Sequence, residues 1–140
     1  MASLRQLFTG RAPLSLLCQE VKEALLPFEV EEVRDAVHVI THCLKPDRTP
    51  VSVWVEMFEG GYLANDGGAA FRKHKFKNPT GAHALLLPIA DEFEVELAAH
   101  PVHGFQLQLA APDVDRMRSA IIATANAAAI GMRALARLQD

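Results

Sequence analysis

The sequence predicts an α+β fold for a single domain over residues 1–140, in which an N-terminal helix precedes an antiparallel sheet and a long C-terminal helix packs on that sheet. Three observations predict it: a short amphipathic run before Pro27, several runs in which apolar and polar residues alternate, and apolar residues at helical spacing from Val114 onward. Half of the residues are hydrophobic and 22% are charged, which is typical of a chain with its own core.

The first helix is predicted over residues 13–26. Its apolar residues recur at intervals of three and four, at Leu14, Leu17, Cys18, Val21 and Leu25. Pro13 suits the first turn of a helix and Pro27 cannot continue one, so both ends carry a boundary signal.

Three strands are predicted next, as an antiparallel meander over residues 35–43, 51–58 and 61–64. In the second strand, one face is Val51, Val53, Val55 and Met57, and the other is Ser52, Trp54, Glu56 and Phe58. A Pro-Asp loop joins the first two strands. The Glu59-Gly60-Gly61 turn joins the second to the third, because its glycines supply the positive φ angles of a tight hairpin.

Two segments separate this meander from a second hairpin. The stretch "GAAFRKHKF", residues 68–76, predicts a short helix, and residues 82–93 fit either a helix bent at Pro88 or a buried strand. Residues 93–100 and 104–111 then alternate again and predict two further strands with polar outer faces.

The last helix is predicted from Val114 to Leu138, after an N-cap at Asp113. At about 1.5 Å per residue it spans nearly 40 Å, more than the width of a compact domain of this size. A seam of small residues runs along it: Ala120, Ala123, Ala127, Gly131 and Ala134. Such residues allow another backbone to approach closely, so the seam contacts the domain's own sheet or the helix of a second copy in a homodimer.

The basic residues are unevenly distributed in a chain of net charge -3. The excess lies in "FRKHKFKN", at Arg72, Lys73, Lys75 and Lys77. This stretch is either a solvated face or a contact patch for an acidic partner or for phosphate. Its flanking Phe71 and Phe76 leave direct nucleic-acid binding open, because aromatic side chains beside cations can stack on bases.

Neither cysteine indicates a cofactor. Cys18 and Cys43 fit no metal or redox spacing and are interpreted as reduced thiols of a cytoplasmic protein. We read no export signal, and no run approaches the roughly 18 uninterrupted apolar residues of a membrane span. The sequence thus predicts no cofactor and no membrane partner.

Histidines and carboxylates raise two alternatives involving a metal. His38 and His42 share a strand face and His100 and His103 share a turn, but linear spacing shows no convergence on one point, so no metal ligand is assigned. A metal-dependent nuclease or other hydrolase would use Glu56 and Asp66, with Lys73 nearby. Glu94 and Glu96 are the alternative carboxylates for such a site. The spacing of acids and lysine that this chemistry commonly shows is absent.

The stretch "GYLANDGGAA" is the most distinctive point of the chain. We expect Asn65, Asp66, Gly67 and Gly68 to form a structural turn, in which Asp66 hydrogen-bonds its own backbone and a glycine adopts the left-handed conformation. The stretches "DAVHVIT", "VSVWVEMFEGGYLANDGG" and "LQLAAPDVDRMRSAIIATANAAAIGMRAL" resemble a bacterial and phage family known as domain of unknown function eighteen twenty-eight, over Asp35 to Leu135. The family favours Asp-Asp-Gly where this chain has Asn65-Asp66-Gly67.

The resemblance implies an α+β fold in a prokaryotic or mobile-element protein and no established activity. The sequence as a whole predicts a non-enzymatic protein that binds a protein or a protein–nucleic-acid complex through Arg72 to Lys77. One concrete version is an inhibitor of a host nucleic-acid-handling complex, such as an anti-CRISPR protein.

Overall fold

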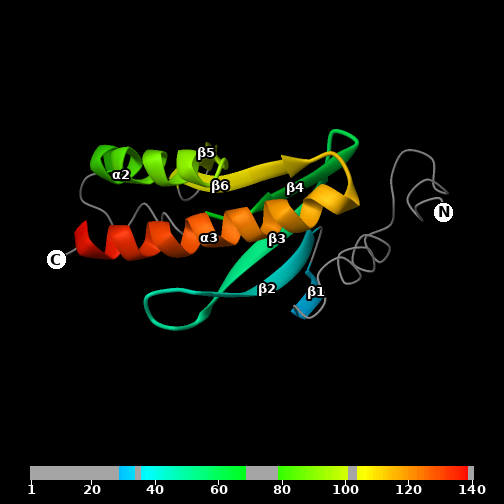
Figure 1. The fold of residues 1–140 in the computed structure, drawn as a ribbon, viewed down its shortest axis with the longest axis horizontal. Coiled ribbons are helices and arrows are strands. Elements are labelled where there is room, and N and C mark those ends of the chain that lie inside the picture. The colour runs from blue at the N-terminus through cyan, green and yellow to red at the C-terminus, as the bar shows by residue number, and fades with distance from the viewer. Residues whose placement is uncertain (1–28, 34–35, 69–78, 101–103, 139–140) are drawn as a thin grey trace.

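The computed structural model describes residues 29–33, 36–68, 79–100 and 104–138 as a sheet with two helices on one of its faces (Figure 1). The helices predicted at residues 13–26 and 68–76 lie outside these residues, apart from Gly68. The elements are β1 Glu29–Val33, β2 Ala36–Leu44, β3 Pro50–Phe58, β4 Gly61–Asn65, α2 Pro79–Glu92, β5 Glu96–His100, β6 Gly104–Ala111 and α3 Val114–Leu138.

The sheet is antiparallel throughout, in the order β1-β2-β3-β4-β6-β5. This confirms the predicted meander and hairpin and joins them into one sheet through the pairing of β4 with β6. Strand β1 was not predicted, because its sequence "EVEEV" carries adjacent glutamates that interrupt the alternation.

The segment after residue 82 is a helix, which decides between the two predicted alternatives. Helix α2 contains Pro88 and continues to Glu92, so β5 begins at Glu96 and not at the predicted Phe93. Glu94 has a φ of 57°, a left-handed conformation that separates the end of the helix from the strand.

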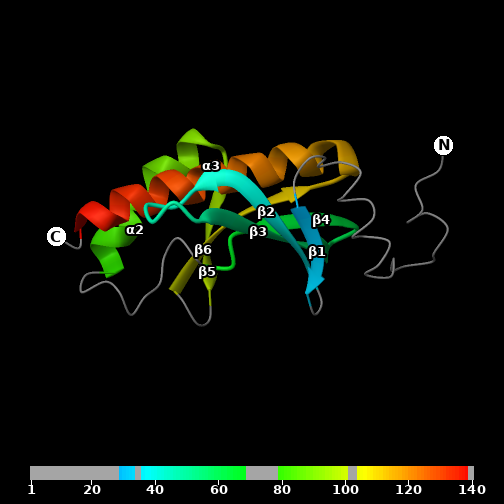
Figure 2. The same cartoon turned by 90° about the horizontal axis from the view of Figure 1, so that it is seen from below.

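The core lies between α3 and the face of the sheet that carries the apolar set of each strand (Figure 2). Valines from β2 and β3 meet Tyr62 and Ala64 of β4 and the buried residues of α3. Helix α3 packs on β2, β3, β4 and β6, whereas α2 packs beside it on β5. The fully buried members include Val37, Val39, Val53, Val55, Leu107, Met117, Ile121 and Ala125. Alternation in the strands and helical spacing in α3 thus meet at one apolar layer.

Helix α3 has its predicted bounds. Residues 114–137 are long and apolar enough to cross a membrane, yet 50% of the apolar window is buried inside the domain. This burial against the sheet accounts for the apolar composition, since a core helix of this length carries the same signal.

The small-residue seam on α3 is covered largely by the chain itself. Ala120, Ala127 and Gly131 are buried, and a Cβ at Gly131 would lie 2.8 Å from Leu86 Cδ2 of α2. Ala123 and Ala134 are half-buried. At Gly131 the close approach is made by Leu86 of α2, and Ala120 and Ala127 belong to the domain's own core. The buried part of the seam therefore contacts the chain itself, the first of the two predicted alternatives.

The turn between β3 and β4 also differs from the prediction. Glu59 and Gly60 take the positive φ angles, 45° and 78°, whereas Gly61 is the first residue of β4. Gly61 is required for another reason: a Cβ there would lie 2.5 Å from the carbonyl oxygen of Ala111 on β6.

The loop between β2 and β3 is closed by Asp47. Its Oδ1 accepts hydrogen bonds from Thr49 Oγ1 at 2.6 Å and from the Thr49 backbone N–H at 3.0 Å. These two bonds, the side-chain one first, lower the pKa of the Asp47 carboxyl from its ordinary value. The predicted Pro-Asp loop is therefore held by an Asx-type turn.

Packing of α2 on the seam predicts contrasting effects at two adjacent leucines. Leu86 is 0% exposed and Leu87 is 43% exposed. We expect Leu86→Ala to lower the free energy of unfolding by about 2–5 kcal/mol, because it opens a cavity beside α3. Leu87→Ala should change it by about 0.5 kcal/mol. Chemical denaturation of both variants measures this, and equal effects would contradict the packing.

Candidate functional site: a polar row on the open face of the sheet

One row of residues crosses all six strands on the face of the sheet away from α2 and α3. The strand register places in line Glu31, His38, Trp54, Asn65, Gln108 and Glu96. We call these six residues the polar row, and the sheet face that carries them the open face. Among the described residues, no helix or strand packs on this face (Figure 2).

Among the described strand residues, the carboxylates of the open face have no basic counterpart. The open face carries the carboxylates of Glu31, Glu56 and Glu96, and the described strands place no lysine or arginine on it. His38 and His42 share this face, as predicted from the alternation in β2. A surface of this charge attracts cations and repels phosphate groups.

A hydrogen bond and a ring stack join the first three members of the row. Glu31 Oε1 lies 2.9 Å from His38 Nδ1, and the His38 ring stacks on the Trp54 indole at 4.4 Å between centroids and 28° between planes. The side chain of Glu31 is 59% exposed and that of His38 is 17% exposed. The stack therefore forms a half-buried platform with one accessible carboxylate at its edge.

The predicted Asn65–Gly68 turn also contacts Trp54 of this platform. Asn65 Oδ1 accepts a hydrogen bond from the Gly67 N–H at 2.9 Å, and Gly67 and Gly68 have φ angles of 64° and 78°. A Cβ at Gly67 would lie 2.9 Å from Trp54 Nε1. The turn is therefore architectural, as predicted, and its first glycine also makes room for the indole.

Asp66 anchors the turn to the second hairpin. Its Oδ1 accepts hydrogen bonds from the Gly68 N–H at 3.0 Å and from the Leu107 N–H at 2.9 Å, and its own N–H donates to the Leu107 carbonyl at 3.0 Å. The residue is 1% exposed. This carboxylate is thus a structural group that extends the pairing of β4 with β6.

Amide side chains continue the row on the second hairpin. Gln108 Nε2 donates to Glu96 Oε2 at 3.2 Å, and Gln106 Nε2 donates to Gln108 Oε1 at 2.7 Å. The first bond connects β6 to β5 across the open face, and the second runs along β6. The row thus ends in a carboxylate on each outer strand, Glu31 on β1 and Glu96 on β5.

The structure does not bring together the residues proposed for a hydrolase. Glu56 stands opposite Leu63, whereas Asp66 follows Asn65, which stands opposite Trp54. The two acids are thus separated by about 10 Å along the strands, and Asp66 is committed to backbone bonds. The described residues contain no group of three potential metal ligands.

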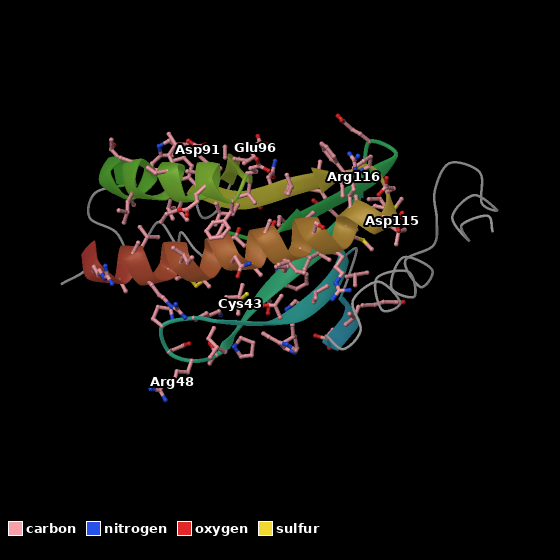
Figure 3. The ribbon with its side chains drawn as sticks, viewed as in Figure 1. Cys43, Arg48, Asp91, Glu96, Asp115 and Arg116 are labelled. Carbon is pink, nitrogen blue, oxygen red and sulfur yellow. The ribbon has the colours of Figure 1, made fainter. Side chains whose placement is uncertain are left out.

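Other predicted site residues fall outside the described part or have ordinary roles. Arg72, Lys73, Lys75 and Lys77 lie outside it. Cys43 is a half-buried free thiol whose Sγ donates to Asn126 Oδ1 on α3 at 3.2 Å (Figure 3). Outside the predicted sites, His83 of α2 contacts the ring of Phe105 at 4.7 Å between centroids.

One local feature of the sequence points to the polar row. Trp54, the only tryptophan, falls on the polar side of the alternating β3 segment, where an aromatic residue has no core to fill.

Comparisons of the chain with models of known families, with curated proteins and with solved structures find no match. The resemblance to family eighteen twenty-eight stays a prediction.

Gly60 and Gly67 both have a positive φ, but only a Cβ at Gly67 would contact Trp54. Alanine at each position therefore distinguishes the cost of the contact from the cost of the backbone conformation. Gly60→Ala should lower the free energy of unfolding by about 1 kcal/mol, because its added Cβ would meet no atom within 4 Å and only the left-handed backbone opposes it. Gly67→Ala should cost about 1–3 kcal/mol more, because its Cβ meets the indole. Unfolding curves and the fluorescence of Trp54 measure this. Equal costs and an unchanged spectrum would contradict the contact.

The anchoring role of Asp66 predicts a large loss of stability on its removal. Asp66→Ala leaves two buried N–H groups without their acceptor and should lower the free energy of unfolding by about 2–4 kcal/mol. Asp91→Ala, at an exposed position on α2, is the control and should change it by no more than about 0.5 kcal/mol. Similar values for both variants in thermal or urea unfolding would show that Asp66 does not anchor the turn.

Proposed function

We propose that this protein is a non-enzymatic binding protein of the cytoplasm and that it engages a protein, or the protein part of a protein–nucleic-acid complex, through the open face. The polar row carries the proposal. It sets an aromatic platform, two carboxylates and two amides on one side of a regular sheet that the described helices leave uncovered.

Trp54 is the favoured centre of the contact. Tryptophan is enriched among residues that dominate binding energy at interfaces, where it is half-buried before binding and surrounded by polar groups. Trp54 has this setting, with His38 stacked on it and Glu31 at the edge of the platform. An aromatic platform can also accept the guanidinium of an arginine by cation–π contact.

Charge favours a partner surface that presents basic side chains. Glu31, Glu56 and Glu96 would each attract a lysine or arginine, and they would oppose the phosphates of a nucleic acid. Direct nucleic-acid binding through the open face is therefore disfavoured. The stretch from Arg72 to Lys77 remains a second candidate contact, with opposite charge.

The biological setting follows from the resemblance alone. In a prokaryote or a mobile element, a small binding protein of this kind would act as an inhibitor that occupies a host nucleic-acid-handling complex, as anti-CRISPR proteins do. Proteins in such complexes have basic surfaces that bind nucleic acid, and an acidic face competes for them by the same electrostatics.

The hydrolase alternative loses its main support. A metal site that uses Asp66 needs that carboxylate to face an accessible cavity, and here it is buried and accepts two backbone hydrogen bonds. Glu56 lies on the open face without a second described carboxylate opposite it in the register. A binding role uses the same residues without this requirement.

Affinity capture with variants of the open face tests the proposal. The tagged chain should retain one stoichiometric protein from a prokaryotic host lysate after nuclease treatment. Glu31→Lys combined with Glu96→Lys should reduce the captured amount at least tenfold, because two attractive charges become repulsive. Glu92→Lys, at an exposed position on α2, is the matched control and should capture normally.

A variant at Trp54 tests the aromatic platform itself. Trp54→Ala should abolish capture while circular dichroism shows a folded chain. Loss of the partner on nuclease treatment would indicate nucleic-acid binding. Capture that survives both open-face variants and fails when Arg72, Lys73, Lys75 and Lys77 are changed to glutamate would move the contact to the basic stretch.

A further inference from the structure

Helix α3 has an outward stripe opposite its core side. Its positions follow one another at intervals of three and four residues and fall within an arc of about 80°. They are Asp115, Ser119, Ile122, Asn126, Ile130, Arg133 and Arg137. Ile122 and Ile130 are 37% and 41% exposed, and only Asn126 is half-buried. This stripe is distinct from the small-residue seam.

We propose that the outward stripe binds the same stripe of a second copy of this chain, with the two α3 helices antiparallel and the two-fold axis at Asn126. When the stripe of the second copy runs in the opposite direction, its residues are complementary to those of the first on both sides of Asn126. Ile122 then faces Ile130 of the second copy, Ser119 faces Arg133, and Asp115 faces Arg137. Every one of these contacts occurs twice, as a two-fold interface requires.

Charge selects the antiparallel arrangement over the parallel one. Side by side in the same direction, the helices would place Arg133 against Arg133, Arg137 against Arg137 and Asp115 against Asp115. In the antiparallel arrangement Asp115 meets an arginine at both ends, about 33 Å apart, and the isoleucines pack on each side of the axis. The stripe therefore specifies its orientation as well as its partner.

The position of the stripe leaves it accessible for this contact. Figure 1 shows α3 across the sheet on the side nearer to the viewer, and Figure 3 places Asp115 in its first turn. Cys43 of β2 reaches Asn126 from the side, and α2 lies along the seam at Gly131. The open face of the sheet is on the opposite side of the molecule, so this dimer does not involve the polar row of either copy. The inference does not rest on the proposed function.

A charge swap tests the pairing of Asp115 with Arg137. Sedimentation equilibrium of the wild type should show a dimer, and Arg137→Asp should raise its dissociation constant about tenfold or more, because two attractions become repulsions. The double variant Asp115→Arg with Arg137→Asp should restore dimerisation. Arg116→Asp is the matched control, because this exposed arginine of the same helix lies outside the stripe.

Thermal unfolding of the same samples accounts for effects on the helix itself, since Asp115 and Arg137 also complement the helix dipole. A wild-type chain that stays monomeric at every concentration would overturn the proposal. So would a dimer whose dissociation constant responds equally to Arg137→Asp and Arg116→Asp.

Disulfide cross-linking tests the orientation. In chains with Cys18→Ser and Cys43→Ser, Ile122→Cys mixed with Ile130→Cys should give the mixed disulfide on oxidation. Two residues 122 in the antiparallel dimer are offset by about 12 Å along the axis, beyond the span of a disulfide. A disulfide formed by Ile122→Cys alone, in preference to the mixed one, would show a parallel arrangement and overturn the proposed register.

Discussion

The pairing of β4 with β6 is the constraint on which the rest of the structure depends. It joins the meander of β1 to β4 to a hairpin whose residues follow about 40 positions later in the chain. Asp66 strengthens this junction, because its backbone and its carboxylate both bond to Leu107. All five residues of β4 are buried, and Gly61 allows the carbonyl of Ala111 to approach. One strand thus determines both the continuity of the sheet and the surface on which α3 packs.

The same pairing aligns the polar row. Trp54 and His38 belong to the meander, whereas Gln108 and Glu96 belong to the hairpin, and only the register of Asn65 opposite Gln108 places them in one line. A shift of that register by one residue would move Asn65 to the helical side and a core residue to the open face. The turn after β4 therefore serves the site indirectly, since it fixes the register and positions the indole through Gly67.

Local patterns in the sequence predict most of the fold and little of the site. Alternation identifies β2, β3 and β4, and helical spacing identifies α3 to its last residue, because each of these signals lies within one element. Strand β1 is not predicted, because its consecutive glutamates interrupt the alternation. The seam on α3 is visible in the sequence, but the contact of its Gly131 with Leu86 of α2 joins distant segments and is not. The polar row depends in the same way on long-range register, so Trp54 on the polar side of β3 was its only local sign.

Fluorine NMR of the chain labelled at Trp54, its only tryptophan, tests the central claim most directly, because the single resonance reports on the centre of the open face. Addition of the captured partner should shift or broaden this resonance, and a saturating amount should move it completely to a new position. A resonance that stays unchanged while the partner binds stoichiometrically would contradict the assignment of the polar row as the contact surface.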